Sequence, residues 1–349
     1  MKNRSAIVLL GVASILLLVS FLFARCGEER RSQPAADAGA AHVVEFPRDK
    51  AKRLQRVQAA VRGTQPAQPP RPASDLVERA LRGKDSDGAL FVEINAIRHS
   101  PLAEKILRCR EQELMESFED LKKEVGIDPS QDVDRIGFDG DTLVVSGFFS
   151  DLTMPPKLGE PMPHGDAGRL WQIKGDDGAS FFVGQVGDGL LVTHFEEAGV
   201  KAAIDRAEGR AESAPPLPAG VSAAEVYGVV GPQMLKSLLA DSQEPMAAQM
   251  GEMLQQGIVR MNVEEEVAMS FDLKARTEQE GEDLAKALGA ALAVGRKKAQ
   301  AEGATEFARL LEQARIVPGA GGAFELDLAV PGESILRMMG CDLDARPAP

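Results

Sequence analysis

An uncharged segment near the N-terminus constrains this chain more than any other feature. Ala6 to Ala24 (AIVLLGVASILLLVSFLFA) holds 19 residues without a charge, and Lys2, Arg4 and Arg25 flank it. A helix needs about 20 predominantly apolar residues to cross the hydrocarbon core of a bilayer. We therefore expect residues 1–26 to form a transmembrane anchor that holds the rest of the chain at a membrane.

Two other interpretations of this segment stay open. A cleaved signal peptide has an apolar core of about 7–15 residues and small residues before the cleavage site, whereas Phe21, Leu22 and Phe23 occupy that place here. A lipoprotein signal would make Cys26 the lipidated residue, but Arg25 stands where a small residue is usual. Flanking charges decide the orientation poorly. We place the N-terminus inside, which predicts a single-pass inner-membrane protein of a bacterium with its C-terminal body in the periplasm.

Charge is divided unevenly along the chain. The net charge of −13 over 349 residues combines a basic part, residues 1–84 with 15 Lys/Arg and 7 Asp/Glu, and an acidic part, residues 85–349 with 25 and 46. An acidic body repels phosphate groups. Nucleic acid is therefore not expected as a partner.

Residues 27–74 are rich in Ala, Pro, Gln and Arg and lack the apolar content that orders a domain. They are predicted to form a disordered stalk, extended and semi-rigid in its Pro-rich part. Within it, residues 48–62 (RDKAKRLQRVQAAVR) place apolar residues at helical spacing among basic ones. This segment is either a short amphipathic helix on anionic lipid headgroups or a solvated part of the stalk. Its small apolar face without an aromatic residue favours the second interpretation.

From residue 75 onward the pattern predicts an α+β body made of two related halves, 75–212 and 213–345. Each half is expected to start with a strand, continue with a helix that a proline opens, and end in a pair of strands. In the first half these segments are 89–94, 100–125, 133–140 and 142–150; in the second they are 224–230, 231–256, 257–264 and 266–275. Strands in runs with helices packed on one face indicate mainly antiparallel sheet in both halves, and helices are expected to cover one face of each sheet. The other face would be open to solvent or a partner.

The two predicted halves then diverge. The first continues with strands at 169–175, 179–187 and 189–195 and a helix carrying Val200, Ile204 and Ala207 on one face. In the second, a long helix begins at Thr277, where Thr277 and Glu280 match a capping box. A shorter helix around Phe307, strands near 314–319 and 323–330, and a closing helix at 334–339 complete the body.

The three cysteines, Cys26, Cys109 and Cys341, are too few for a disulfide scaffold and have no metal-ligand spacing. Cys109 points away from the apolar stripe of its predicted helix. An exposed thiol in an oxidising compartment tends to find a partner. We hypothesise that Cys109 pairs with Cys341 across the two halves. Two unrelated free thiols remain the alternative, since spacing cannot show proximity.

No group of residues forms a catalytic, cofactor or metal signature. The stretch Gly319 to Gly322 precedes a strand and lacks the lysine of a phosphate loop, so it is interpreted as a hairpin turn. The acidic clusters at 85–88 and 128–134 lack calcium-loop spacing and are interpreted as Asx turns. Histidines are scattered, and the serines lack a nucleophile elbow. We therefore assign no catalytic, cofactor-binding or metal-ligating residue, and no cofactor.

Two weaker features point to binding. The Pro/Gly-rich segment 152–168 is a long irregular loop, and such loops often carry function. Methionines gather in the second half, where they either fill the core or form an adaptable surface: Met234, Met246, Met250, Met253 and Met261. We expect a membrane-anchored envelope protein that acts as a binding or interaction module for an envelope partner, through an open sheet face or this loop. The alternative is a hydrolase whose Asp and His residues are dispersed between the halves.

Overall fold

The computed structural model of the chain describes the body but not the segments before it. The described residues are 75–109, 118–119, 122–123, 126–150, 152, 160–174, 180–217, 220–234, 252–339 and 341. The predicted anchor (1–26) and stalk (27–74), and Met246 and Met250, lie outside them. Within the described ranges, no helix is both long enough and apolar enough to cross a bilayer.

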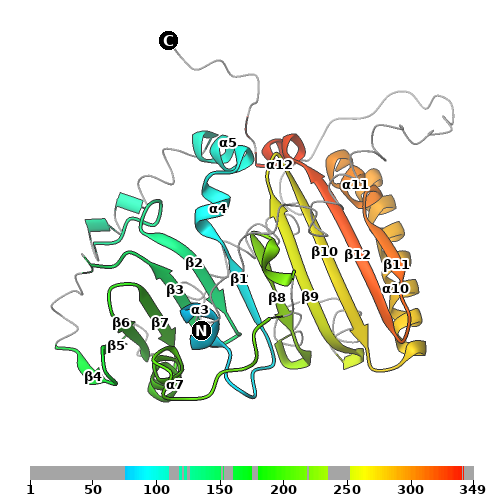
Figure 1. The fold of residues 1–349 in the computed structure, drawn as a ribbon. Helices are drawn as coiled ribbons and strands as arrows, with labels where there is room; N and C mark the ends of the chain where they lie inside the picture. The colour runs from blue at the N-terminus through cyan, green and yellow to red at the C-terminus, as the bar shows by residue number, and fades with distance from the viewer. Residues whose placement is uncertain are drawn as a thin grey trace, which may run out of the picture.

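The described strands join into one antiparallel sheet. In chain order they are β1 (Ala89–Val92), β2 (Val133–Phe138), β3 (Leu143–Gly147), β4 (Met162–His164), β5 (Gly168–Lys174), β6 (Ser180–Val186), β7 (Leu190–His194), β8 (Val226–Val230), β9 (Leu254–Val263), β10 (Glu266–Ala275), β11 (Arg315–Pro318) and β12 (Ala323–Pro331). Across the sheet the order is β11-β12-β10-β9-β8-β1-β2-β3-β7-β6-β5-β4 (Figure 1). The predicted large antiparallel sheet with helices is therefore confirmed.

Helices lie between and beside these strands. They are α3 (Leu76–Leu81), α4 (Ile94–Arg98), α5 (Pro101–Cys109), α7 (Glu197–Ala207), the 3-10 turn η2 (Val221–Ala223), α10 (Glu278–Ala301), α11 (Thr305–Glu312) and α12 (Gly332–Met338). Figure 1 shows α10 and α11 along the β11 edge of the sheet, while α3 and α7 lie with the strands of the other half.

The sheet is built outward from the antiparallel pair of β1 and β8, where Phe91 lies opposite Tyr227. On one side of this seam the order is β1, β2, β3, β7, β6, and on the other it is β8, β9, β10, β12, β11. On each side the second and third strands form a hairpin, β2 with β3 and β9 with β10. On each side the fifth strand, β6 or β11, also comes before the fourth, β7 or β12, in the chain. The first half then adds β5 and β4 at its edge.

One predicted boundary needs correction. The helical region expected through Gln256 instead gives way to a strand, because β9 already begins at Leu254. Leu254 lies opposite Ala275 of β10 and is buried in a cluster with Leu273 and Phe324. Pairing with β10 and burial outweigh the local helical pattern at this position.

The two faces of the sheet exchange their polarity at the β1–β8 seam. We call the face of the sheet that carries Phe91 the Phe91 face. One row of residues across this face is apolar in the first half and polar in the second. From β5 to β12 the row consists of Leu170, Gly184, Val192, Val144, Gly137, Phe91, Tyr227, Arg260, Ser270 and Asp327. The opposite row, the Val92 face, shows the reverse trend; it runs Arg169, Gln185, Leu191, Val145, Ile136, Val92, Val226, Met261, Met269, Leu328.

Helices pack against these apolar surfaces and therefore lie on both faces of the one continuous sheet, whereas a sheet in each half with one covered face was expected. On the Phe91 face, α7 packs against Gly184, where an added Cβ would lie 2.6 Å from Val200, and α3 packs against Gly137. On the Val92 face of the second half, α10 buries Leu284 against Leu273, and α12 buries Leu336 beside Val330. Amphipathic helices must bury their apolar stripe against apolar strand residues, and those residues change sides at the seam.

The hypothesised disulfide is confirmed. Cys109, the last residue of α5, is bonded to Cys341, just beyond α12, with a Cα–Cα distance of 5.7 Å and a sequence separation of 232 residues. Cys341 is buried in the core cluster of the Val92 face together with Leu102 of α5 and Leu336 of α12. The bond thus joins a helix of the first half to the end of the second.

Two of the expected turns are also present. Gly321 and Gly322 adopt φ angles of +64° and +82° in the turn between β11 and β12, a conformation that glycine adopts without steric cost. Asp128 accepts a hydrogen bond from the backbone N–H of Ser130 at 3.0 Å, as in an Asx turn. At 85–88, in contrast, Asp87 does not make an Asx-turn bond; its carboxylate accepts the backbone N–H of Met234 at 2.7 Å, far away in the chain.

Candidate functional site

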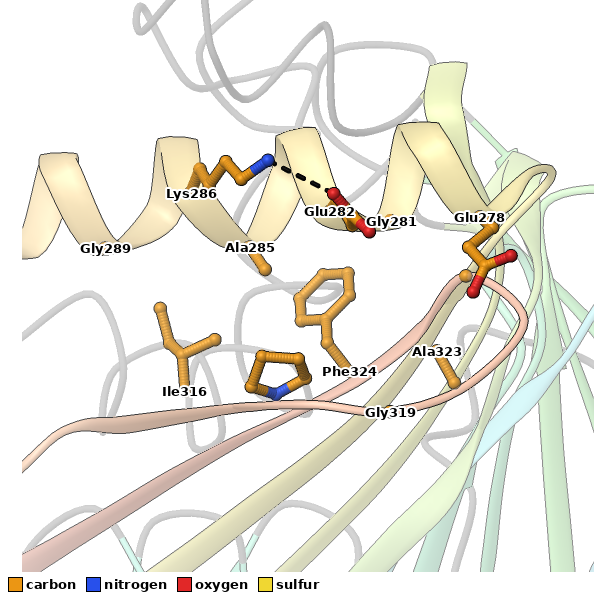
Figure 2. Close-up of a pocket in the computed structure, with 12 residues that line it drawn as sticks. Glu278, Gly281, Glu282, Ala285, Lys286, Gly289, Ile316, Gly319, Ala323 and Phe324 are labelled. Carbon is orange, nitrogen blue, oxygen red and sulfur yellow. Dashed lines mark hydrogen bonds and ion pairs between the residues drawn. The ribbon is translucent and has the colours of Figure 1, made fainter.

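A groove between α10 and the β11–β12 hairpin is the candidate binding site. Its volume is about 390 Å³, within the range of small-ligand pockets but at its lower end. Figure 2 shows the helix passing above the hairpin with the side chains between them. The lining residues are Glu278, Gly281, Glu282, Ala285, Lys286 and Gly289 from α10, and Ile316, Pro318, Gly319, Gly322, Ala323 and Phe324 from the hairpin.

The capping box predicted from the sequence fixes where α10 begins. The Thr277 hydroxyl accepts a hydrogen bond from the Glu280 backbone N–H at 3.2 Å, and the Glu280 carboxylate accepts one from the Thr277 N–H at 3.1 Å. These two bonds satisfy backbone donors that the first turn leaves unpaired. At the next turn, a Cβ on Gly281 would lie 2.4 Å from the carbonyl oxygen of Gly322. Helix and hairpin are therefore in backbone contact here, which requires glycine.

Two turns later, the side of the helix that faces the groove has open space beside it. A Cβ built on Gly289 would meet no atom within 4 Å, although Gly289 still lines the groove. The groove therefore opens from Gly281 toward Gly289. Its floor is made of Ile316, Pro318 and Phe324, which share the Val92 face of the sheet.

Charged side chains form the rim of the groove on its helix side. Glu282 pairs with Lys286 at 3.2 Å, and both side chains are more than half exposed. Among the described residues, the carboxylate of Glu278 has neither an ion-pair nor a hydrogen-bond partner. An apolar floor beside an unpaired carboxylate suits a ligand that carries an aliphatic group next to a positive charge.

The hairpin edge next to the groove is poorly suited to adding another strand. Gly319 donates its N–H to the carbonyl oxygen of Ala323 at 2.8 Å. The alternation of an antiparallel ladder then turns the peptide groups of Ile316 and Pro318 outward. Proline has no N–H, so this edge offers only the N–H of Ile316 to a new strand. This edge is therefore poorly suited to recognition by strand addition, and side chains are the groups that the groove presents.

A second cluster, which we call the seam clamp, joins α3 to the centre of the sheet. Asp75 caps α3 by accepting the Val77 N–H at 3.1 Å and also pairs with Arg135 of β2. The Nε of Arg135 lies 2.7 Å from the carboxylate of Glu93, which also accepts the Tyr227 hydroxyl at 2.9 Å. Burial opposes the charge of Arg135, but Tyr227, Glu93 and Asp75 outweigh it and raise the pKa of the guanidinium.

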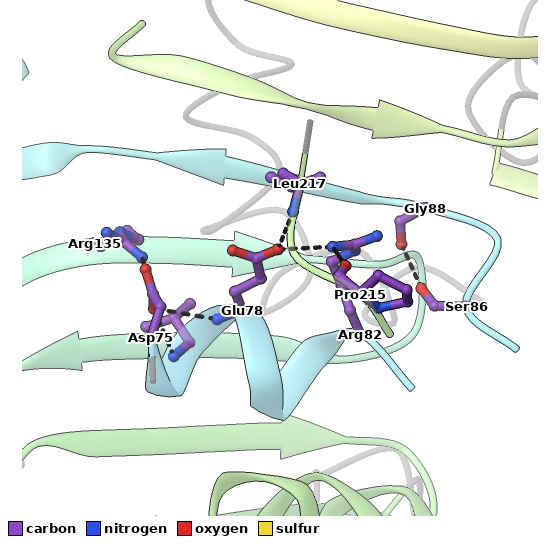
Figure 3. Close-up of polar contacts among 9 residues, drawn as sticks. Asp75, Glu78, Arg82, Ser86, Gly88, Arg135, Pro215 and Leu217 are labelled. Atoms are coloured by element: carbon purple, nitrogen blue, oxygen red, sulfur yellow. Dashed lines mark hydrogen bonds and ion pairs between the residues drawn. The ribbon is translucent and has the colours of Figure 1, made fainter. Parts of the chain in front are cut away.

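Helix α3 also holds the connection between the two halves (Figure 3). The Glu78 carboxylate accepts the backbone N–H of Leu217 at 2.8 Å and pairs with Arg82 at 2.7 Å. Arg82 in turn donates to the carbonyl oxygen of Pro215 at 2.6 Å. Helix α3 is therefore bonded to residues of both halves, and these bonds hold the N-terminal end of the described body in place.

Polar groups are buried where the Phe91 face continues into the second half. Asn262, Ser270 and Asp327 are each under 10% exposed. Both amide atoms of Asn262 lack a hydrogen-bond partner within the described part of the chain. Nearby, Glu225 accepts the Val263 N–H at 3.1 Å. Burial raises the pKa of Glu225, and the charges of Glu264 and Glu93 raise it further.

The Glu225→Gln variant is expected to be more stable than the parent chain at neutral pH. The folded state holds the Glu225 proton more tightly than the unfolded chain, whose glutamate pKa is about 4.3. The contribution of Glu225 to stability is therefore present below that value and is lost as the pH rises through the raised pKa of the folded state. Glutamine can still accept the Val263 N–H and carries no charge. Denaturant unfolding at pH 7 and pH 4 measures the effect.

The exposed Glu302 at the end of α10 provides the matched control. The Glu302→Gln variant should unfold like the parent at both pH values. An equal gain in stability for both variants would contradict the raised pKa of Glu225. A gain for Glu225→Gln that is as large at pH 4 as at pH 7 would contradict it as well.

The described part of the 152–168 loop is fastened to α7. His164 lies 2.8 Å from Asp205, which also pairs with Arg210 at 2.6 Å. Glu208 accepts the backbone N–H groups of Asp166 and Ala167 at 3.1 and 2.9 Å. Burial would raise the pKa of Glu208, but these N–H groups and Arg210 outweigh it and lower the pKa. The loop segment 153–159 lies outside the described residues.

This arrangement gives no support to catalysis at His164. Within the described ranges, no serine, threonine or cysteine side chain hydrogen-bonds to the imidazole, and no group of three or more His, Cys, Asp or Glu residues could hold a metal ion. Among the described methionines of the second half, Met234 and Met261 are under 10% exposed, and the partly buried Met253 packs against a core cluster. The hydrolase alternative stays a prediction.

Comparison with known proteins adds little to this picture. No family model and no curated protein matches the chain. It is similar to solved structures of TP0453 in crystal forms I, III and IV, at 12%, 13% and 12% identity. The matches cover 75% of this chain and 96–97% of TP0453, with TM-scores of 0.43, 0.41 and 0.39. A similarity this distant carries no statement about function.

Proposed function

We propose that this chain is a membrane-anchored envelope protein that acts as a binding or interaction module. In this proposal, residues 1–26 span the inner membrane once, residues 27–74 form a stalk, and the body lies in the periplasm as two related halves, 75–212 and 213–345. The uncharged segment Ala6–Ala24 supports the anchor. The Cys109–Cys341 bond supports an oxidising compartment. The matching strand orders on the two sides of the β1–β8 seam support the relation of the halves.

The groove between α10 and the β11–β12 hairpin is the observation that carries the binding role. It combines an apolar floor with an exposed charged rim, whereas the fastened segment 165–167 and the buried polar groups around Asn262 offer no such opening. Concave apolar sites with a few placed polar groups are where proteins hold ligands and partner side chains. The module therefore engages its partner at the edge of the sheet farthest from β4.

The Ala285→Trp variant tests this role, because an indole at position 285 fills the groove without changing charge. Full-length parent and variant are recovered from detergent-solubilised envelope after crosslinking, and co-purifying proteins are quantified by isotope-labelled mass spectrometry. We expect the partners of the parent to be depleted at least tenfold with Ala285→Trp.

The control is Ala293→Trp, at an exposed position of the same helix outside the groove. It should retain the partners of the parent. Denaturation midpoints within error of the parent establish that both variants fold. Equal recovery of the same proteins with Ala285→Trp and Ala293→Trp would contradict a binding role for the groove.

A further inference from the structure

We propose that the groove binds residues 48–62 of its own chain, an inference that rests on the groove being the binding site. This segment, RDKAKRLQRVQAAVR, carries six Lys/Arg against a single Asp. It places Leu54, Val57 and Val61 among those charges. An aliphatic group beside a positive charge is the combination that the floor and rim of the groove accept.

The charge of the groove complements that of the segment. The charged residues of the groove's lining are Glu278, Glu282 and Lys286, all from α10. Glu282 is paired with Lys286, while the carboxylate of Glu278 has no partner among the described residues. A basic side chain at the mouth of the groove would pair with Glu278 while its aliphatic neighbour covers Ile316 and Phe324.

The tether is long enough for this contact. Asp75 is held at Arg135 on β2, and six strand spacings separate β2 from β11. That is about 29 Å across the sheet, with about 10 Å more to reach the layer on the opposite face. Eighteen residues separate Val57 from Asp75 and span up to about 60 Å when extended. Tethering also raises the effective concentration of the segment to the millimolar range, so weak contacts suffice for occupancy.

A membrane surface is the competing binding site for residues 48–62. The apolar face of this segment is small and has no aromatic residue, which disfavours insertion between lipid headgroups. The acidic groove, in contrast, is present in every copy of the chain.

The test places a photo-crosslinking amino acid at Val57 of the full-length protein in nanodiscs that contain anionic lipid. We expect crosslinks to peptides within 278–289 and 316–324 of the same chain. Mixing isotope-labelled and unlabelled protein before irradiation separates contacts within one chain from contacts between copies. The Glu278→Lys variant should lower the yield at least fivefold, and Asp283→Lys, an equal charge change outside the groove lining, should change it less than twofold.

Crosslinks to lipid, to a second copy or to other parts of the body would each overturn the proposal, as would equal effects of the two lysine variants. The capture experiment with Ala285→Trp separates this failure from that of the proposed function. If the crosslinks miss the groove while Ala285→Trp still loses its partners, only the self-docking is wrong. If Ala285→Trp also keeps its partners, the groove is not a binding site.

Discussion

Replacing Cys109 and Cys341 by serine is expected to lower the free energy of unfolding of the body by about 5 kcal/mol. The bond closes a loop of 232 residues, and the chain-entropy account gives about 5 kcal/mol for a loop of this length at 25 °C. It also holds Leu102 of α5 and Leu336 of α12 in one core cluster on the Val92 face. Urea unfolding of the double variant beside the parent measures the loss.

The Cys26→Ser variant is the control for this prediction, because Cys26 is the third cysteine and takes no part in the bond. It should unfold like the parent. Thiol titration of the denatured parent should find one free thiol. Three free thiols, or a double variant as stable as the parent, would contradict the assigned bond.

Replacing Arg135 by methionine is expected to cost about 3 kcal/mol, since removing one partner of a buried charged group leaves the others uncompensated. Asp75 and Glu93, the two carboxylates that Arg135 holds, are each about 15% exposed. Both carboxylates would then lose the cation that they share. Thermal unfolding of the variant beside the parent at pH 7 measures the loss.

Arg315→Met, at an exposed position of the edge strand β11, makes the same change in charge and should shift stability by less than about 0.5 kcal/mol. A double variant, Arg135→Met with Asp75→Asn, should recover part of the loss. Equal effects of the two arginine substitutions would show that the seam clamp adds nothing beyond net charge.

Local features of the fold could be predicted from the sequence because short-range chemistry decides them. The capping box at Thr277 and Glu280 starts α10 as expected, and the glycines at 321 and 322 make the expected turn. Val200, Ile204 and Ala207 are buried on one face of α7, as their spacing predicts. The Cys109–Cys341 pair could only be a hypothesis beside two free thiols, because spacing does not show which cysteines lie close together.

The arrangement of faces could not be predicted in the same way. Alternation along a strand shows that one face is apolar, but only the register between distant strands shows which one. Phe91 lies opposite Tyr227, and Tyr227 lies opposite Arg260, so an apolar row becomes a polar row within three strands. That change puts α7 and α10 on opposite sides of one continuous sheet, where a sheet in each half with one covered face was expected.

The groove escaped prediction for a related reason. Gly281, Ala285 and Gly289 recur every four residues along α10, which is a visible signal, but the same spacing is found where helices pack tightly. Gly281 does make such a contact with Gly322, while Gly289 faces open space. A tightly packed helix and an open groove differ only in whether the helix and the hairpin move apart along their length, and tertiary packing decides that.

A continuous sheet that exchanges its apolar face at the β1–β8 seam is the frame on which the groove, the disulfide and the seam clamp all depend. Hydrogen exchange of the full-length protein in mild denaturant, read by mass spectrometry, tests it most directly. The slowest-exchanging amides should come from both halves, with β1 and β8 opening together with β3, β9 and β10 in one cooperative unit. Slow amides confined to one half, with the other half opening in a separate transition, would contradict a single sheet.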